Sequence, residues 1–218
     1  MARDSDGSAA RAHNPPPPPD TLIPSQRARR HRIVLGALAL LERQPYDKIQ
    51  MRDVAEEADV ALGTVYRYFG SKEHLFAAVL VEWGNKLSLH VQRRPLRGDT
   101  PAERLDALMM RILTAFERWP DVFGAVMLID TTTDPYARDL HREFASREGA
   151  TMADALEGLS DSDAELIVRV TNAMLSSVMR SWSHGTITMA EARRLMTGTI
   201  ELIFSPPPQL GGLCRDAS

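Results

Sequence analysis

The sequence predicts an all-α fold, and three observations support this. Apolar residues recur at spacings of three and four along most of the chain. Proline and glycine interrupt these periodic runs at intervals of about one helix length. The β-branched residues follow the same helical spacing, so no segment alternates as a half-buried strand does. We expect helices at residues 25–43, 51–58, 62–68, 72–93, 102–118, 121–130, 135–157, 162–184 and 188–204.

The first of these helices is expected to follow a proline-rich leader. Residues 15–19 are all proline, so we expect residues 1–24 to form a disordered or polyproline-type extension, either a solvated leader or a ligand for a partner. Ser25 is a plausible N-cap of the first helix, which we expect to stop at Arg43 because Pro45 follows. At the other end, residues 205–218 contain Pro and Gly runs and are expected to be a disordered tail.

Composition fits a globular protein that stays inside the cell. Of the 218 residues, 44% are hydrophobic and 25% charged, which allows a sizeable core. The single cysteine, Cys214, forms no intramolecular disulfide, so we expect a reducing cytoplasm as the setting. Cys214 is either a reactive thiol or an incidental residue of the tail. No run of about 18 apolar residues and no signal peptide is present, so we expect cytoplasmic localisation and no membrane partner.

Charge divides unevenly along the chain. Residues 21–75 carry nine Lys and Arg against seven Asp and Glu, a net charge of +2. Residues 76–218 carry fifteen against nineteen, a net charge of −4. The sign of this difference is the one expected for an N-terminal nucleic-acid-binding module, for which it is weak support.

Residues 51–69 have the pattern of a helix-turn-helix. Met51, Val54, Ala55 and Ala58 make one apolar face, and the two small alanines let a second helix cross closely. Asp59 stands in the turn, where Asp is one of the few side chains that tolerates a left-handed backbone. We therefore predict a three-helix helix-turn-helix domain at residues 25–75 and a larger helical domain at residues 76–204.

The second helix of this motif has an outward face suited to DNA. Val65 and Phe69 should point inward, which leaves an outward face with hydroxyls, a cation, a glycine and no acidic residue. Gly63 would allow close approach in the major groove, and Arg67 is the best candidate to read a base edge, although it could also reach a phosphate. Ser71 should cap the next helix beside the DNA backbone. The predicted DNA contacts are Arg52, Leu62, Gly63, Thr64, Tyr66, Arg67, Tyr68 and Lys72.

At these residues the chain resembles the TetR family of bacterial regulators. The resemblance runs from about Arg30 to Val81 and is carried by the string Val-Ala-Glu-Glu-Ala-Asp-Val-Ala-Leu-Gly-Thr-Val-Tyr-Arg-Tyr-Phe-Gly-Ser-Lys-Glu-His-Leu. Two positions depart from the usual pattern: Asp59 replaces the turn glycine, and Gln50 replaces the Ser or Thr that caps the second helix. Gln50 either weakens that cap or adds an amide contact to phosphate. The resemblance implies a regulator of transcription that binds double-stranded operator DNA.

The variant with Gln50 and Asp59 is most similar to the actinobacterial repressors of cholesterol catabolism within that family. This similarity implies a sterol-derived or other fatty acyl-CoA thioester as the effector. The middle helices match this subgroup poorly. A constitutive DNA-binding regulator or an activator without a ligand is the alternative.

The TetR resemblance also implies a homodimer formed by the last two long helices, at about 162–184 and 188–204. Symmetry would place two recognition helices about one DNA turn, roughly 34–36 Å, apart on a palindromic operator. Apolar residues cover more than one face of these helices, as packing both internally and against a partner requires. They include Ile167, Val170, Met174, Val178, Leu195, Met196, Ile200 and Ile203.

The middle helices are rich in Met, Phe and Trp, which either line an adaptable apolar pocket or form ordinary core. We expect a small apolar effector there, with the helix at 72–93 as the lever that moves the recognition helix. The predicted pocket residues are Met109, Phe116, Trp119, Phe123, Met127, Phe144 and Met174.

Nothing in the sequence favours an enzyme, and we expect no cofactor and no metal. The six histidines are scattered, with no pair at the i, i+4 spacing of a metal site. No phosphate-binding glycine loop and no Gly-x-Ser-x-Gly elbow occur. Asp130 and Asp134 lie four residues apart and suggest either a metal site or, more simply, a solvated helix end. Ser183 and His184 fit a helix terminus better than a catalytic pair.

Overall fold

The computed structural model describes residues 15–92 and 96–205, and within these ranges it contains helices and no strand. The predicted all-α fold is confirmed, and most helix ends agree within one or two residues. The elements are the short 3-10 helices η1 (Pro19–Thr21) and η2 (Tyr46–Lys48) and the α-helices α1 (Pro24–Leu41), α2 (Met51–Glu57), α3 (Leu62–Tyr68), α4 (Lys72–Gln92), α5 (Pro101–Arg118), α6 (Pro120–Asp130), α7 (Pro135–Ala155), α8 (Asp161–Ser183) and α9 (Met189–Phe204).

The helices divide into two compact units that do not coincide with the predicted domains. The first unit contains residues up to Trp83 together with 124–143, and the second contains 84–123 and residues from Phe144 onward. The predicted boundary after residue 75 is therefore too simple, because the chain returns to the first unit at 124–143. The spacing of apolar residues predicts where each helix lies in the sequence. It does not predict which helices pack together in the fold.

Residues 15–24 are folded in the structure, which corrects that part of the extension predicted at residues 1–24. Pro16 and Leu22 are buried, and η1 lies between them. Helix α1 begins at Pro24 rather than at Ser25, since proline fits the first helical position and Ile23 N–H donates to Gln26 Oε1 at 3.3 Å. The rest of the predicted extension, 1–14, and residues 206–218 of the predicted tail lie outside the described residues, and so does Cys214.

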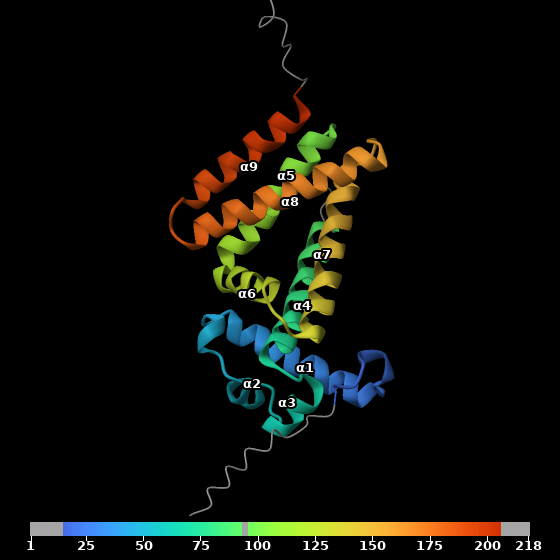
Figure 1. The fold of residues 1–218 in the computed structure, drawn as a ribbon, viewed down its shortest axis with the longest axis vertical. Helices are drawn as coiled ribbons and strands as arrows, with labels where there is room; N and C mark the ends of the chain where they lie inside the picture. The colour runs from blue at the N-terminus through green and yellow to red at the C-terminus, as the bar shows by residue number, and fades with distance from the viewer. Residues whose placement is uncertain (1–14, 93–95, 206–218) are drawn as a thin grey trace, which may run out of the picture. The chain divides into compact units, whose positions relative to one another are not determined.

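In the first unit, α1, α2 and α3 pack against one another (Figure 1). Their shared core is apolar, and it includes Ile33, Val34, Ala37, Leu41, Ile49 and Val54. Gly36 of α1 faces α2 closely, because a Cβ built there would lie 3.4 Å from Ala58 Cβ. The small residues at this crossing therefore set the spacing of the first two helices.

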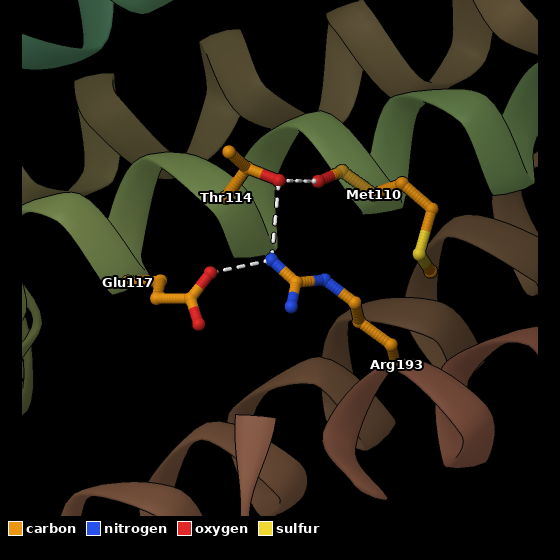
Figure 2. A network of polar contacts seen from close by, with 4 residues as sticks. All are labelled: Met110, Thr114, Glu117 and Arg193. Carbon is orange, nitrogen blue, oxygen red and sulfur yellow. Dashed lines mark hydrogen bonds and ion pairs between the residues drawn. The ribbon is translucent and has the colours of Figure 1, made fainter. Parts of the chain in front are cut away.

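In the second unit, α9 packs against both α5 and α8 (Figure 1). Helix α5 contributes a buried stripe at helical spacing, which includes Leu105, Leu108, Met109, Ile112 and Phe116. Polar contacts fix the register of α5 and α9. Arg193 Nη2 donates to Glu117 Oε2 at 2.6 Å and to Thr114 Oγ1 at 3.3 Å, and Thr114 in turn donates to the Met110 carbonyl (Figure 2).

The ends of the later helices follow local sequence signals. Thr100 and Thr188 form reciprocal capping boxes with Glu103 and Glu191, in which each glutamate accepts from the threonine backbone N–H. Gly185 ends α8 with a φ of 70°, a left-handed backbone that glycine adopts without strain. Among the described residues, no helix is long and apolar enough to cross a membrane.

Candidate nucleic-acid interface

The turn between α2 and α3 has the geometry predicted for a helix-turn-helix. Asp59 has a φ of 51°, the left-handed conformation expected at the position where the family usually has glycine. Val60 N–H donates to the Ala55 carbonyl at 2.9 Å, which closes the turn over the C-terminal end of α2. Ala55 and Ala58 are buried, so the crossing of α2 and α3 uses the small side chains identified in the sequence.

The inward face of α3 is wider than predicted, which overturns the assignment of Tyr68 to the DNA-facing side. Val65 and Phe69 are fully buried as expected, but Tyr68 is also only 2% exposed. Tyr68 lies three residues after Val65, so both side chains point to the same side of the helix. Its hydroxyl accepts a hydrogen bond from Arg67 Nη2 at 3.3 Å, so Tyr68 supports Arg67 from the core.

The remaining predicted residues of α3 form the outward face. Leu62 is 41% exposed, Gly63 and Arg67 are exposed, and Thr64 and Tyr66 are half-buried. A Cβ built on Gly63 would meet no atom within 4 Å, so the fold itself does not require glycine there. The Arg67 guanidinium lies over the Tyr68 ring, 5.1 Å from its centroid. This face therefore presents a cation, hydroxyls and an open backbone at one place.

The start of α2 carries two more of the predicted DNA contacts, Gln50 and Arg52. The Gln50 backbone N–H donates to Asp53 Oδ2 at 2.8 Å, so the carboxylate of Asp53 accepts from a backbone donor at the N-terminus of α2. The Gln50 side chain is exposed, and so is Arg52, whose Nε lies 3.5 Å from Asp53 Oδ1. Both predicted contacts therefore remain on the solvent side of α2.

Lys72 is more restrained than predicted for a simple phosphate contact. Its Nζ donates to the Tyr46 carbonyl and lies 4.0 Å from the centroid of the Tyr46 ring. Burial lowers the pKa of Lys72, and the neighbouring carboxylates of Glu73, Asp47 and Asp53 partly oppose this shift. Burial also raises the pKa of Tyr46 to about 12. Lys72 therefore links η2 to the start of α4 through these two contacts.

The first turn of α4 contains the predicted cap and a contact that the sequence analysis missed. Ser71 Oγ accepts from His74 N–H at 2.9 Å, as expected of an N-cap. The same hydroxyl donates to Asp134 Oδ2 at 2.7 Å. No sequence signal links residues that lie 63 positions apart. Asp134 and Asp130 have separate partners, because Asp130 Oδ1 lies 3.2 Å from His141 Nε2.

Most of the predicted pocket residues are buried. Met109, Phe116, Phe123 and Phe144 are buried, while Trp119, Met127 and Met174 are half-buried. The rings of Phe116 and Phe123 meet edge to face, with centroids 5.4 Å apart. Met127 falls in the first unit and the other six residues in the second. A common binding site for these residues stays a prediction.

Helices α8 and α9 have both a buried and an exposed apolar face, as predicted. Val178, Met196 and Ile200 are buried, and Ile167, Met174 and Ile203 are half-buried. Large apolar side chains are also strongly exposed on these two helices. They are Leu166 at 60%, Val170 at 41%, Leu195 at 45% and Leu202 at 78%.

Comparison with known proteins agrees with this geometry. Residues 33–79 match the family model described as bacterial regulatory proteins, tetR family. The repressor KstR of Mycobacterium tuberculosis is 35% identical over 138 residues, 63% of this chain and 57% of the relative, so the matched region spans little more than half of that relative. The KstR of Mycolicibacterium smegmatis is 29% identical over 85% of this chain and 91% of the relative.

Two solved structures share the fold. A TetR regulator from Rhodococcus has a TM-score of 0.73 at 23% identity, over 84% of this chain and 99% of that one. Thermus thermophilus FadR, a TetR-family repressor solved with lauroyl-CoA, has a TM-score of 0.65 at 19% identity, over 86% of this chain and 97% of that one. Both KstR relatives are named repressors of transcription. Residues 33–79 thus match the tetR family of bacterial regulatory proteins, and the chain is similar to the KstR repressors.

Proposed function

We propose that the protein is a ligand-responsive repressor in the cytoplasm that binds a palindromic operator as a homodimer. The observation that carries the proposal is the outward face of α3, where the open position at Gly63 lies beside Thr64 and Arg67 with no acidic residue. A face without acidic side chains suits a phosphate backbone, and a glycine allows a helix to approach the base edges.

The homodimer is supported by the exposed apolar residues of α8 and α9. Leu166, Val170, Leu195 and Leu202 lie on these two helices and are at least 41% exposed. Burying such side chains against a second copy stabilises a dimer by about 25 cal/mol per Å² of apolar area removed from water. A two-fold dimer would present two copies of α3 to successive turns of a palindromic duplex.

The effector is proposed to be a small apolar molecule, with an acyl-CoA thioester or a sterol derivative as the first class to test. The Thermus thermophilus FadR that shares this fold was solved with lauroyl-CoA. The resemblance of the sequence to repressors of cholesterol catabolism implies the same class of effector. The half-buried Trp119 and Met174 of the second unit are accessible enough to contact such a molecule.

DNA binding is tested by measuring the affinity for double-stranded fragments as the salt concentration is varied. Because cationic side chains displace condensed counterions, affinity for a selected duplex should fall steeply with salt. Arg67→Ala should cost ~1–3 kcal/mol and relax the preference at one base pair. Arg142→Ala is the matched control, since Arg142 is an exposed arginine of α7 that pairs with Asp139 and is predicted to touch no DNA. A wild-type protein without salt-dependent affinity for any duplex would refute the proposal.

The effector is tested by thermal melting with acyl-CoA thioesters and sterol acids. A bound ligand at a hundred times its Kd stabilises the protein by about 2.7 kcal/mol and raises the melting midpoint. The same ligand should weaken binding to the selected duplex, while free coenzyme A serves as the control. If DNA binding is present but no compound changes it, the protein is a constitutive regulator or activator without a ligand.

A further inference from the structure

A carboxylate on the loop after α6 contacts the first turns of two helices in the first unit. Asp134 Oδ2 accepts from the Ser71 hydroxyl at 2.7 Å, and Ser71 is the N-cap of α4. Asp134 Oδ1 accepts from Ala137 N–H at 2.9 Å, so the same side chain caps α7. Both helix N-termini carry partial positive charge, which favours a carboxylate between them.

The ring of His74 packs beside this carboxylate. It stacks on Tyr136 of α7 with centroids 5.2 Å apart, and it meets Phe69 edge to face at 5.2 Å. His74 Nδ1 accepts from Gly70 N–H at 3.3 Å. Phe69 is the C-cap of α3, and Gly70 follows it. The end of the recognition helix is therefore held against the first turn of α7 through one buried imidazole. We call Ser71, His74, Asp134 and Tyr136 the Asp134 junction.

The junction contacts the C-terminal end of the recognition helix. Helix α3 has seven residues, so its own hydrogen bonds fix its direction weakly, and packing at its ends decides it. At the C-terminal end, Phe69 is fully buried and contacts the His74 ring, and the Arg30 guanidinium lies 4.8 Å from the Phe69 centroid. A shift of His74 or of the first turn of α4 must therefore move Phe69.

We infer that Asp134 and Tyr136, which are remote from the helix-turn-helix in sequence, are positioning residues for DNA recognition. They fix the angle of α3 by holding Ser71 and His74, and they contact no DNA themselves. This inference rests on the proposed function and deepens it, because it assigns a route by which a change at the start of α7 would alter operator affinity. A helix held in one orientation loses less conformational entropy on binding, so freeing it weakens specific binding.

The test compares Ser71→Ala with Ser160→Ala as a matched control. Ser160 Oγ accepts from Asp163 N–H at 3.2 Å, so each substitution removes one serine N-cap from a long helix, but only Ser71 also contacts Asp134. The probe is a duplex that the wild-type protein selects from a randomised pool, with a scrambled duplex of the same length for non-specific binding.

Ser71→Ala and Asp134→Ala should each weaken binding to the selected duplex about tenfold, with little change on the scrambled duplex. Ser160→Ala should leave both affinities unchanged. Ser71→Thr keeps the hydroxyl and should restore most of the affinity. Tyr136→Leu should show a smaller loss of the same kind, because it removes the stacked ring and keeps an apolar contact.

A second measurement reports on the junction without DNA. Amide hydrogen exchange at residues 62–70 of the free protein should become faster in Asp134→Ala and stay unchanged in Ser160→Ala. Faster exchange without any duplex binding would refute the proposed function and leave the junction as a local positioning device. Wild-type affinity of Asp134→Ala for the selected duplex, or unchanged exchange in α3, would overturn the inference.

Discussion

Acidification should destabilise the protein through His74, and the effect can be calculated from its surroundings. Burial and, to a smaller extent, the positive charge of Arg30 lower the pKa of His74 from 6.5 to about 4, although the carboxylate of Asp134 partly opposes this shift. The unfolded chain keeps the ordinary value. As the pH falls, a proton therefore binds to the unfolded state before it binds to the folded state, and the equilibrium shifts toward unfolding.

The stability that neutral His74 contributes is complete above about pH 6.5, is lost between pH 6.5 and 4, and does not change further below pH 4. At pH 5.0 the unfolded imidazole is almost fully protonated and the folded one is not. Linkage then gives a loss of ~2 kcal/mol relative to pH 7.5, and the full shift corresponds to ~3 kcal/mol. His74 is only 7% exposed, so solvent does not screen this shift appreciably.

The assay is urea unfolding at pH 7.5 and 5.0, at one protein concentration, for the wild type and for His74→Phe. The variant keeps an aromatic ring between Tyr136 and Phe69 but has no titratable group there. Other carboxylates and histidines titrate in both proteins, so the difference between the two losses isolates His74. We expect the wild type to lose ~2 kcal/mol more than His74→Phe. Equal losses, or an imidazole pKa near 6.5 in an NMR titration, would refute the reasoning.

Three further substitutions test the packing described above. Gly63→Ala should raise the free energy of unfolding by ~0.5–1 kcal/mol, since its Cβ meets no atom, and should weaken duplex binding. Gly84→Ala should destabilise by ~1–3 kcal/mol in urea unfolding, because the new methyl would lie 2.6 Å from Phe144 Cε2. Arg193→Ala should cost ~1 kcal/mol or less, measured in the same assay at low and high salt, because its ion pair with Glu117 is partly exposed.

The helices were predictable because their apolar spacing and their ends depend on nearby residues. The capping boxes at Thr100 and Thr188 each span four residues, and a sequence shows them directly. The same is true of Asp59, whose left-handed backbone follows from its place between two short helices. Local signals of this kind also identified α3 as the candidate recognition helix.

Tyr68 marks the limit of that reasoning. Its ring is apolar enough for the core and its hydroxyl is polar enough for a phosphate, so the side chain alone does not decide its direction. Val65 and Phe69 define the inward face of α3, and Tyr68 lies on the same side because it follows Val65 by three residues. Burying the large ring of Tyr68 is more favourable than keeping its single hydroxyl in water. The hydroxyl then keeps a partner in Arg67. A helical wheel that includes the width of the buried face would have assigned it correctly.

Contacts between distant segments could not be predicted at all. Ser71 was identified as a cap, but its bond to Asp134 depends on residues 124–143 returning to the first unit. Pro16 was predicted to lie in a disordered or polyproline-type extension, yet it is buried, and its Cδ would lie 3.9 Å from a Cβ on Gly70. The periodicity of a single sequence does not show which distant segment of the chain packs over a given turn.

Gly63 and Gly84 both lie inside helices, where glycine costs about 0.5–1 kcal/mol relative to alanine, but the structure gives them opposite reasons. Packing inside the protein requires glycine at position 84, since Phe144 occupies the space that a side chain would need. At Gly63 that space is empty, so nothing in the described fold offsets the cost of glycine. A contact outside the chain can offset it, and a groove of DNA approaching the backbone of α3 is such a contact. We therefore attribute Gly84 to the packing of the fold and Gly63 to binding. The sequence alone does not distinguish these two reasons for a glycine.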